Sequence, residues 1–268
     1  MSKTKVVVVT GVSSGIGRAT AEKFVSRGCK VFGTVRNSAS AHAIPGVVPI
    51  EMDVRDDASV QRAFQTIIAQ AGHIDVLVNS AGVTLLGATE ETSLAEAQSL
   101  FDTNVFGVLR CIQAVLPSMR AQRSGRIVNV SSVLGFLPAP YMGLYSASKH
   151  AVEGMSETLD HEVRNFGVRV VLVEPSYTKT NLELNAPHAA SKIAAYDDER
   201  TVVSRAIQKS VSGAPGPDGV AAAIVDAALG KWKMRRTPKG QAALLSKLRR
   251  FMPAGPVDAN LRKTFGLA

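Results

Sequence analysis

The sequence predicts an α/β protein, built as a doubly wound parallel sheet of about seven strands with helices on both faces, in a single domain spanning 1–268. Two observations support this prediction. Short runs rich in β-branched residues alternate along the chain with helical patterns, which is the order that a parallel sheet requires. The first run, KVVVVT at 5–10, is apolar without alternation, as expected of a strand that is buried on both faces.

The same alternation places each element in order. The predicted strands cover 5–10, 30–35, 47–53, 75–82, 125–132 and 168–175. The predicted helices follow the first strand and then cover 58–72, 93–122, 145–166 and 218–230. Gly28, Gly72 and Gly167 mark helix ends, and Pro175 stops the sixth strand. A short edge strand at 231–236 and an amphipathic helix at 241–252 complete the prediction.

Composition excludes several classes of protein. No apolar run approaches the ~20 residues that a membrane span needs, and the start of the chain lacks the long apolar stretch of a signal peptide. The two cysteines, Cys29 and Cys111, lie far apart and beside no histidine cluster. This pattern predicts free thiols in a reducing compartment rather than a disulfide or a metal site, so we expect a cytoplasmic protein without a metal.

The net charge of +9 is concentrated in a basic C-terminal extension, 231–268. Because the excess is local, we treat it as a surface property and do not expect nucleic acid as a partner. The helix predicted at 241–252 places Leu244, Leu245, Leu248 and Phe251 on one side, beside basic residues. That pattern suits contact with a membrane surface as an accessory trait. It suits a helix packed on the domain, or a dimer contact, better.

The segment 178–215 interrupts the alternation of strands and helices with polar residues, Pro187 and Pro215, and Pro217 follows just after it. A long irregular region in a compact domain is usually functional, so we expect a lid over the substrate. Its apolar residues suggest a pocket for a lipophilic alcohol or ketone. Packing of the lid on the sheet would explain the same residues equally well.

The turn after the first strand carries the first sign of chemistry. Gly11, Gly15 and Gly17 follow a strand and open a helix, which lets a pyrophosphate approach the free N–H groups of the helix N-terminus. Ser13 and Ser14 are expected to add contacts. The spacing is G-x-x-x-G-x-G, which differs from the G-x-G-x-x-G of many dinucleotide sites. The alternative is a tight turn that binds nothing.

The end of the second strand predicts which dinucleotide binds. Sites for NAD usually place an acidic residue there to hold the adenosine ribose, but no carboxylate occurs from Phe32 to Ile50. Arg36 follows the strand instead, and a guanidinium can pair with a 2′-phosphate. We therefore expect NADP(H) to be preferred over NAD(H). A solvated loop charge is the alternative for Arg36.

Tyr145 and Lys149 stand four residues apart and so share one face of the predicted helix. Any helix can show this spacing, and taken alone it favours no function. In a catalytic site, however, the charge of Lys149 would lower the pKa of the Tyr145 phenol from its ordinary value of about 10 toward the range where acid–base catalysis works. His150 and His161 are expected to be surface residues.

Together these motifs resemble those of the short-chain dehydrogenases/reductases, in the branch of the 17β-hydroxysteroid and retinol dehydrogenases. The resemblance covers about 4–180. It includes the turn Thr10, Gly11, Gly15, Ile16 and Gly17, the N-[NS]-A-G turn 79–82, and a serine, Ser132, that precedes Tyr145 by 145 − 132 = 13 residues. Two positions depart from the family pattern, because Ser80 replaces an asparagine and Ser176 replaces a glycine.

The resemblance implies a Rossmann fold and a set of roles. It implies that Tyr145 is the general acid–base, that Lys149 holds the nicotinamide ribose, that Ser132 stabilises the developing oxyanion, and that Asn104 holds a water linked to Lys149. The cofactor residues that it adds to the glycine turn and Arg36 are Asp53, Val54, Asn79, Ala81, Gly82, Pro175, Thr178 and Thr180. It also implies a homodimer or homotetramer built on the helices 93–122 and 145–166.

The sequence therefore predicts an NADP(H)-dependent oxidoreductase that interconverts a carbonyl and an alcohol on a lipophilic small molecule. The alternative is a catalytically silent protein that senses NADPH for a partner. Sensors of that kind typically lose the tyrosine or the lysine, and this chain keeps both.

Overall fold

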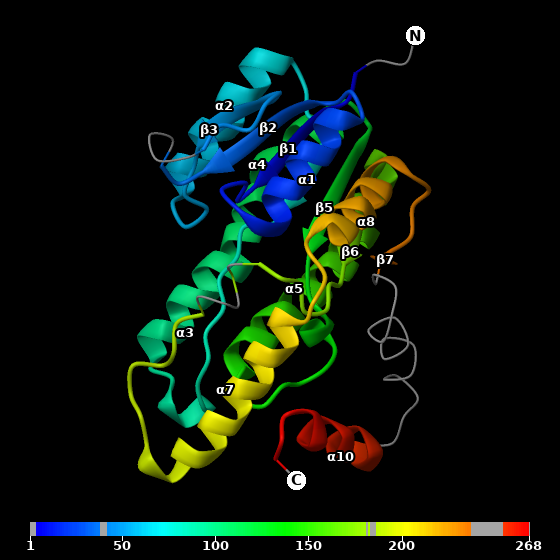
Figure 1. Ribbon diagram of the computed structural model, residues 1–268. Coiled ribbons are helices and arrows are strands. Elements are labelled where there is room, and N and C mark those ends of the chain that lie inside the picture. Colours follow the sequence, from blue (N-terminus) through cyan, green and yellow to red (C-terminus); the bar gives the residue numbers. More distant parts are fainter. Residues whose placement is uncertain (1–3, 38–41, 181, 183–185, 237–253, 268) are drawn as a thin grey trace.

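The structure, a computed structural model, describes residues 4–37, 42–180, 182, 186–236 and 254–267 (Figure 1). Its centre is a seven-stranded parallel sheet with the strand order β3-β2-β1-β4-β5-β6-β7. The strands are β1 Val6–Thr10, β2 Lys30–Val35, β3 Val47–Glu51, β4 Val76–Asn79, β5 Gly125–Val130, β6 Val168–Val173 and β7 Arg235–Arg236. The predicted fold class is confirmed.

Helices cover both faces of the sheet (Figure 1). One face packs against α2 (Asp57–Ala71), α4 (Gly107–Ala121) and α5 (Gly143–Val163), and the other against α1 (Gly15–Ser26) and α8 (Asp218–Leu229). The remaining helices, α3 (Leu94–Phe101), α7 (Asp197–Ser212) and α10 (Ala254–Thr264), lie together at one end of the molecule (Figure 1). The central strands are buried on both faces, which explains their unbroken apolar runs.

The strand order reverses between β1 and β4, and in open parallel sheets ligands bind beyond the carboxyl ends of the strands at such a point. Here the turns after β1 and β4 are tied together by one side chain. The hydroxyl of Thr10, the last residue of β1, accepts hydrogen bonds from the main-chain N–H groups of Ser80 and Ala81, both at 3.0 Å. The topology and this contact together locate the candidate site.

The single helix predicted at 93–122 is divided in two. Between α3 and α4, Asp102–Phe106 forms a π-helical turn, and the N–H of Gly107 donates to the carbonyl of Asp102. Such turns are rare and occur frequently at functional sites. The turn contains Asn104, whose buried side chain bonds to the main chain of Val83.

The segment predicted to be irregular, 178–215, contains the helix α7. Its first turn carries three acidic residues, which favour a helix N-terminus, and Val203, Ile207 and Val211 form a buried stripe at a spacing of four. Within the predicted edge strand 231–236, only Arg235–Arg236 pairs with the sheet. The helix predicted at 241–252 lies outside the described residues. A further helix, α10, was not predicted.

Candidate active site

Two positions in and just after the turn between β1 and α1, Gly11 and Gly17, leave no room for a side chain. Gly11 has a φ of +72°, and a Cβ there would lie 2.8 Å from the Cα of Ala81. A Cβ on Gly17 would lie 2.2 Å from the carbonyl oxygen of Gly11. The first turn of α1 is therefore drawn against the loop, with its N–H groups facing the cleft, which is the geometry that accepts a pyrophosphate.

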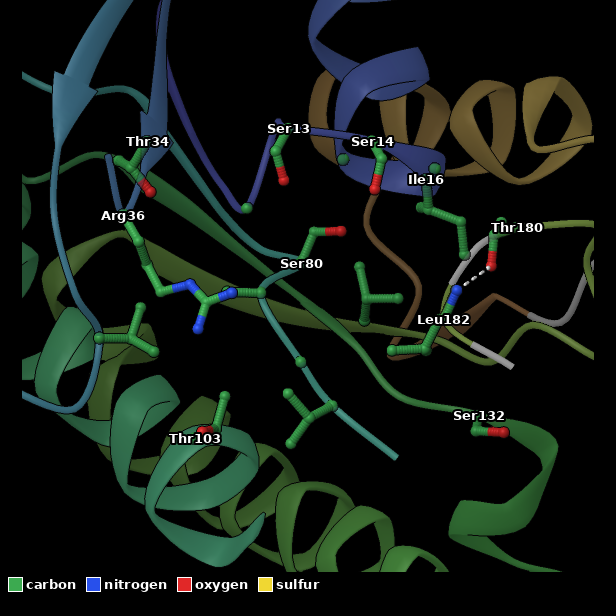
Figure 2. Close-up of a pocket in the computed structure, with 18 of the residues that line it drawn as sticks. Ser13, Ser14, Ile16, Thr34, Arg36, Ser80, Thr103, Ser132, Thr180 and Leu182 are labelled. Atoms are coloured by element: carbon green, nitrogen blue, oxygen red, sulfur yellow. Dashed lines mark hydrogen bonds between the residues drawn. The ribbon is translucent and has the colours of Figure 1, made fainter. Parts of the chain in front are cut away.

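One end of the cleft carries two guanidinium groups. Arg36 follows β2, and its side chain extends across the cleft (Figure 2). Arg55, which the sequence analysis did not identify, also lines the cleft and pairs with Asp53, with 2.8 Å between Nη2 and Oδ2. The hydrogen bonds from Arg55 hold the pKa of Asp53 below its ordinary value, and the charge of Arg36 adds to the effect. No carboxylate occurs at 32–37 or 42–50 to oppose a phosphate there.

At the other end of the cleft lie three predicted catalytic side chains. Tyr145 and Lys149 project from α5, and Ser132 follows β5. The ammonium of Lys149 donates to the carbonyl of Val130 at 3.0 Å and lies 5.7 Å from the centre of the Tyr145 ring. The Oγ of Ser132 accepts from the N–H of Leu134 at 3.1 Å, so its own proton can be donated to a substrate oxygen.

Asn104 lies behind these residues and does not line the cleft. Its amide accepts from the N–H of Val83 at 2.9 Å and donates to the Val83 carbonyl and to the Ser148 hydroxyl, at 2.9 and 3.1 Å. Ser148 in turn donates to the carbonyl of Tyr145 at 2.7 Å. The side chain of Asn104 thus ties the segment after β4 to the helix that carries Tyr145.

Asn79, predicted to contact the cofactor, is also placed away from the cleft. Its amide donates to the side chain of Asn129 on β5 at 2.9 Å, and Asn129 donates to Ser156 on α5 at 2.8 Å. The side chain of Asn79 therefore helps to link β4, β5 and α5. The other predicted site residues all line one cleft, and they are Gly11, Ser13, Ser14, Gly15, Ile16, Gly17, Arg36, Asp53, Val54, Ala81, Gly82, Ser132, Tyr145, Lys149, Pro175, Thr178 and Thr180.

Several cleft residues were not predicted from the sequence. Besides Arg55 they include Thr34, Ser80, Val83, Ser99 and Thr103, whereas Leu182 belongs to the segment predicted to be a lid. Thr34 and Ser80 follow from their places at strand ends, which is a signal that the sequence does contain. Leu182 comes from the segment after β6, and its N–H donates to the hydroxyl of Thr180 at 3.4 Å (Figure 2).

An apolar cluster includes Tyr145. It combines Leu85, Leu86 and Met142 with the buried stripe of α7 and with the last part of the chain, where Phe265 and Leu267 are buried. Tyr141, at the entrance to α5, has a φ of +60°, a strained conformation for a tyrosine. Its hydroxyl donates to Glu199 of α7 at 3.2 Å. Burial, with this contact, raises the pKa of Tyr141 to about 12.

A second carboxylate anchors the segment that leads into α7. Glu91 is buried, pairs with Arg200 and accepts from the N–H groups of Ile193 and Ala88 at 2.9 and 3.1 Å. These bonds, those of Arg200 above all, lower the pKa of Glu91 to about 2. The carboxylate thus joins the loop before α3 to the segment that covers the apolar cluster.

Replacement of Glu91 by glutamine removes this charge while conserving shape. For the reaction predicted from the sequence, we expect KM for a ketone to rise by about two- to tenfold, because α7 loses its anchor, while the Kd for NADPH is unchanged. Thermal unfolding should show wild type more stable than the variant above pH 4.5, with the difference shrinking as pH falls toward 2. Glu90→Gln, on the exposed neighbour that bonds only Tyr196 in the described structure, is the control. An unchanged KM in Glu91→Gln would contradict the anchoring role.

The comparisons with known proteins agree on one family. The family model described as "short chain dehydrogenase" matches 5–191. A 3-ketodihydrosphingosine reductase of Bacteroides thetaiotaomicron is 35% identical over 262 residues, covering 96% of this chain and 97% of that protein. Retinol dehydrogenase 8 of Bos taurus is 39% identical over 191 residues, covering 67% of this chain and 61% of that protein.

Solved structures give the same result. A short-chain dehydrogenase from Streptomyces avermitilis has a TM-score of 0.83 and 36% identity, with 98% of this chain and 96% of that chain covered. Enzymes from Burkholderia phymatum, in complex with NAD, and Burkholderia cenocepacia, in complex with NADP, have TM-scores of 0.78 and 0.77. They are 31% and 26% identical, and the coverage is 92% of both chains for the first and 96% and 97% for the second. Structural neighbours thus bind either nicotinamide dinucleotide.

Proposed function

The chain belongs to the short-chain dehydrogenase/reductase family, and on that premise we propose that it is an NADP(H)-dependent enzyme that interconverts a ketone and an alcohol on a lipophilic molecule. The observation that supports this most directly is the shared cleft. Ser132, Tyr145 and Lys149 face the same space as the glycine turn, so a dinucleotide held by that turn would reach them.

The residues of the cleft fit a dinucleotide. The close turn at Gly11 and Gly17 would hold the pyrophosphate, Asp53 and Val54 the adenine, and Lys149 the nicotinamide ribose, with Pro175, Thr178 and Thr180 beside the nicotinamide. When bound, the cofactor supplies the hydride that reaches the carbonyl carbon.

The protein supplies the proton and holds the oxygen. In reduction, the phenol of Tyr145 donates its proton to the carbonyl oxygen, while the hydroxyl of Ser132 donates a hydrogen bond to the same atom as negative charge develops on it. The ammonium of Lys149, fixed by the Val130 carbonyl, favours the tyrosinate left behind. The side chain of Asn104 is committed to Val83 and Ser148, so its main chain is the group proposed to hold the water that returns a proton through Lys149.

The proposed substrate is a long-chain ketone. The apolar cluster beside Tyr145, built in part by α7 and the chain end, supports a lipophilic substrate. The relative that aligns over nearly the whole chain acts, by its name, on 3-ketodihydrosphingosine, and another acts on retinol. In this reading 178–215 serves as the substrate lid and 231–268 as a basic extension of one domain.

A screen of NADPH oxidation over ketones graded in chain length and polarity tests the function. We expect turnover to rise with chain length, with 3-keto lipids among the best substrates. Retinal and steroid ketones form the comparison set. The absence of NADPH oxidation and of alcohol oxidation by NADP⁺ across the whole set would favour the alternative, a silent sensor of NADPH.

Arg36→Asp tests the choice of cofactor. Removing the guanidinium and adding a carboxylate at the end of β2 should lower kcat/KM for NADPH and raise it for NADH, because a carboxylate repels a 2′-phosphate and accepts from ribose hydroxyls. A total change in the NADPH/NADH ratio of at least about 100-fold is expected, since the lost pairing and the new repulsion each contribute about 1.5–3 kcal/mol. Arg18→Asp, on a side chain that pairs with Glu22 on α1, controls for net charge. An unchanged ratio in Arg36→Asp would remove Arg36 from the phosphate site.

The cysteines bear on the location of the protein. Cys29 and Cys111 are both free, as in proteins of reducing compartments, and this supports a cytoplasmic location. No helix among the described residues is long and apolar enough to cross a membrane. Within the same residues, no group of three or more potential ligand side chains could hold a metal ion.

We propose a homodimer or homotetramer through α3–α4 and α5, as is usual in the family. The basic helix proposed for membrane contact lies outside the described residues.

A further inference from the structure

Two buried carboxyl groups share one cation behind the catalytic residues. Glu153 on α5 and Glu174 at the end of β6 are 4% and 0% exposed. The Nε of Arg235, in β7, lies 3.2 Å from an oxygen of Glu153 and 3.1 Å from an oxygen of Glu174. Its Nη2 lies 2.8 Å from Glu157, which is half exposed to solvent. One guanidinium therefore lies between two buried carboxyls.

Burial and a neighbouring carboxyl act directly on the pKa of Glu153. Burial and the nearby carboxyl of Glu174 raise the pKa of Glu153 to about 7, against the opposing effects of Ser131 and Arg235. The charged or titratable groups around it are Glu174 from β6, Arg235 from β7, and Lys149 and Glu157, one turn before and after it on α5. The pair thus retains a proton up to neutral pH.

Glu153 packs against the segment that carries the catalytic serine. A Cβ on Gly135 would lie 2.6 Å from the Oγ of Ser131, 2.8 Å from the Cγ of Glu153 and 3.0 Å from its Oε1. The side chains of Ser131 and Glu153 therefore lie close to each other beside Gly135. Neither the Oγ of Ser131 nor the Oε1 of Glu153 has an aligned hydrogen-bond partner among the described residues, although the two groups are close enough to affect the pKa of the carboxyl.

Three consecutive residues at the end of β5, Val130, Ser131 and Ser132, lie next to the catalytic groups of the proposed reaction. All three line the cleft; in addition, the carbonyl of Val130 accepts from the ammonium of Lys149, and the side chain of Ser131 lies near Glu153. The segment is fixed from the other side by β6, since the N–H groups of Ser131 and Val133 donate to the carbonyls of Val173 and Pro175, at 2.8 and 2.9 Å. Any shift of Ser131 would displace both Ser132 and the anchor of Lys149.

We propose that Glu153, in its protonated form, is a positioning residue that holds 130–132 in place for Ser132 and Lys149. Arg235 links the strand β7 to this arrangement through its contacts with Glu153 and Glu174. A protonated carboxyl can donate to the hydroxyl of Ser131 and leaves Arg235 to Glu174. Once Glu153 ionises, Glu174 repels it, and it can then only accept a hydrogen bond from the hydroxyl of Ser131. The inference rests on the proposed function, because the positioned groups are those of the proposed reaction.

The variant Glu153→Gln tests the proposal, since glutamine is close in shape to the protonated acid and cannot ionise. We expect wild type and Glu153→Gln to have similar kcat at pH 6. Above pH 7, kcat of wild type should fall further than that of the variant, which then reports only the titration of Tyr145. Glu153→Ala, which removes the support, should lower kcat about 10- to 100-fold with the Kd for NADPH unchanged. Glu157→Gln, on the exposed partner of Arg235, should behave as wild type.

Thermal unfolding provides a readout that needs no turnover. Because the pKa of Glu153 is higher in the folded protein than its ordinary value of 4.5, its contribution to stability is full below pH 4.5 and declines as pH rises to about 7. The Tm of wild type should fall through this window relative to Glu153→Gln, and the Tm of the control Glu157→Gln should fall in parallel with that of wild type. Parallel Tm profiles of wild type and Glu153→Gln, with parallel pH profiles of kcat, would overturn the proposal. If no ketone is turned over, the function fails while the Tm comparison still decides the protonation of Glu153.

Discussion

Replacing Tyr145 by phenylalanine is expected to lower kcat/KM for the reduction of a ketone by about 10²–10⁴-fold, the usual loss when an acid–base group is removed. The change deletes one oxygen atom, the one that would donate the proton. The ring itself belongs to the apolar cluster with Met142 and Leu85, so phenylalanine should occupy the same space. We therefore expect the Tm and the Kd for NADPH to remain close to those of wild type.

The interpretation depends on separating chemistry from packing. Tyr196→Phe makes the same substitution at a tyrosine whose hydroxyl bonds Glu90 at 2.7 Å on the surface, and it should leave kcat unchanged. Steady-state rates at saturating NADPH, with binding measured by the fluorescence of the cofactor, distinguish the two effects. Near-normal turnover in Tyr145→Phe would exclude this tyrosine as the proton donor and would leave the proposed mechanism without one.

The sheet could be predicted because its physical cause is local. A parallel strand covered by helices on both sides has no solvent-facing residue, so Val6–Thr10 is apolar up to its last residue, Thr10, whose side chain serves the turn. The helix ends marked by Gly72 and Gly167 could be predicted for a similar reason. Both glycines adopt positive φ, +78° and +74°, which other residues avoid.

Features that depend on tertiary contacts could not be predicted in this way. The π-helical turn at 102–106 accommodates Asn104 against Val83, a partner 21 positions away, and nothing in the local pattern shows that contact. The sequence of α7 does contain a local helix signal, its acidic first turn and apolar stripe. The prolines on either side of it favoured the prediction of an irregular segment instead. The burial of Phe265 and Leu267 against α7 depends on where the chain returns after 237–253.

In the candidate site, too, contacts between sequence neighbours could be predicted and contacts between distant residues could not. Motifs whose residues are neighbours in the sequence, such as the glycine turn and Tyr145 with Lys149, lie in one cleft. The pairing of Arg55 with Asp53 is short-range, and could have been inferred from a basic residue two positions after the acid. The contact between Glu153 and Arg235 joins residues 82 positions apart, and only the packing of β7 beside β6 brings it about.

The second large effect is expected from Gly17→Ala. The added methyl group would lie 2.2 Å from the carbonyl oxygen of Gly11 and 3.0 Å from its carbonyl carbon, and both are main-chain atoms that no rotamer change can move. The start of α1 must therefore move away from the turn, which separates the N–H groups that would hold the pyrophosphate. Overpacking of this kind costs about 1–3 kcal/mol, so we expect the Kd for NADPH to rise by about 10- to 100-fold.

The matched change is Gly154→Ala on α5, where an added Cβ would have no heavy atom within 4 Å. Alanine is favoured over glycine in a helix by about 1 kcal/mol, so this variant should be at least as stable as wild type and bind NADPH equally. A Gly17→Ala protein that remains folded, by its Tm, and binds NADPH with the wild-type Kd would show that the close approach of α1 to the turn is not needed for the cofactor. Weak binding by a folded Gly17→Ala protein, beside normal binding by Gly154→Ala, would place the dinucleotide at this turn, since the two variants differ in where the same methyl group is added.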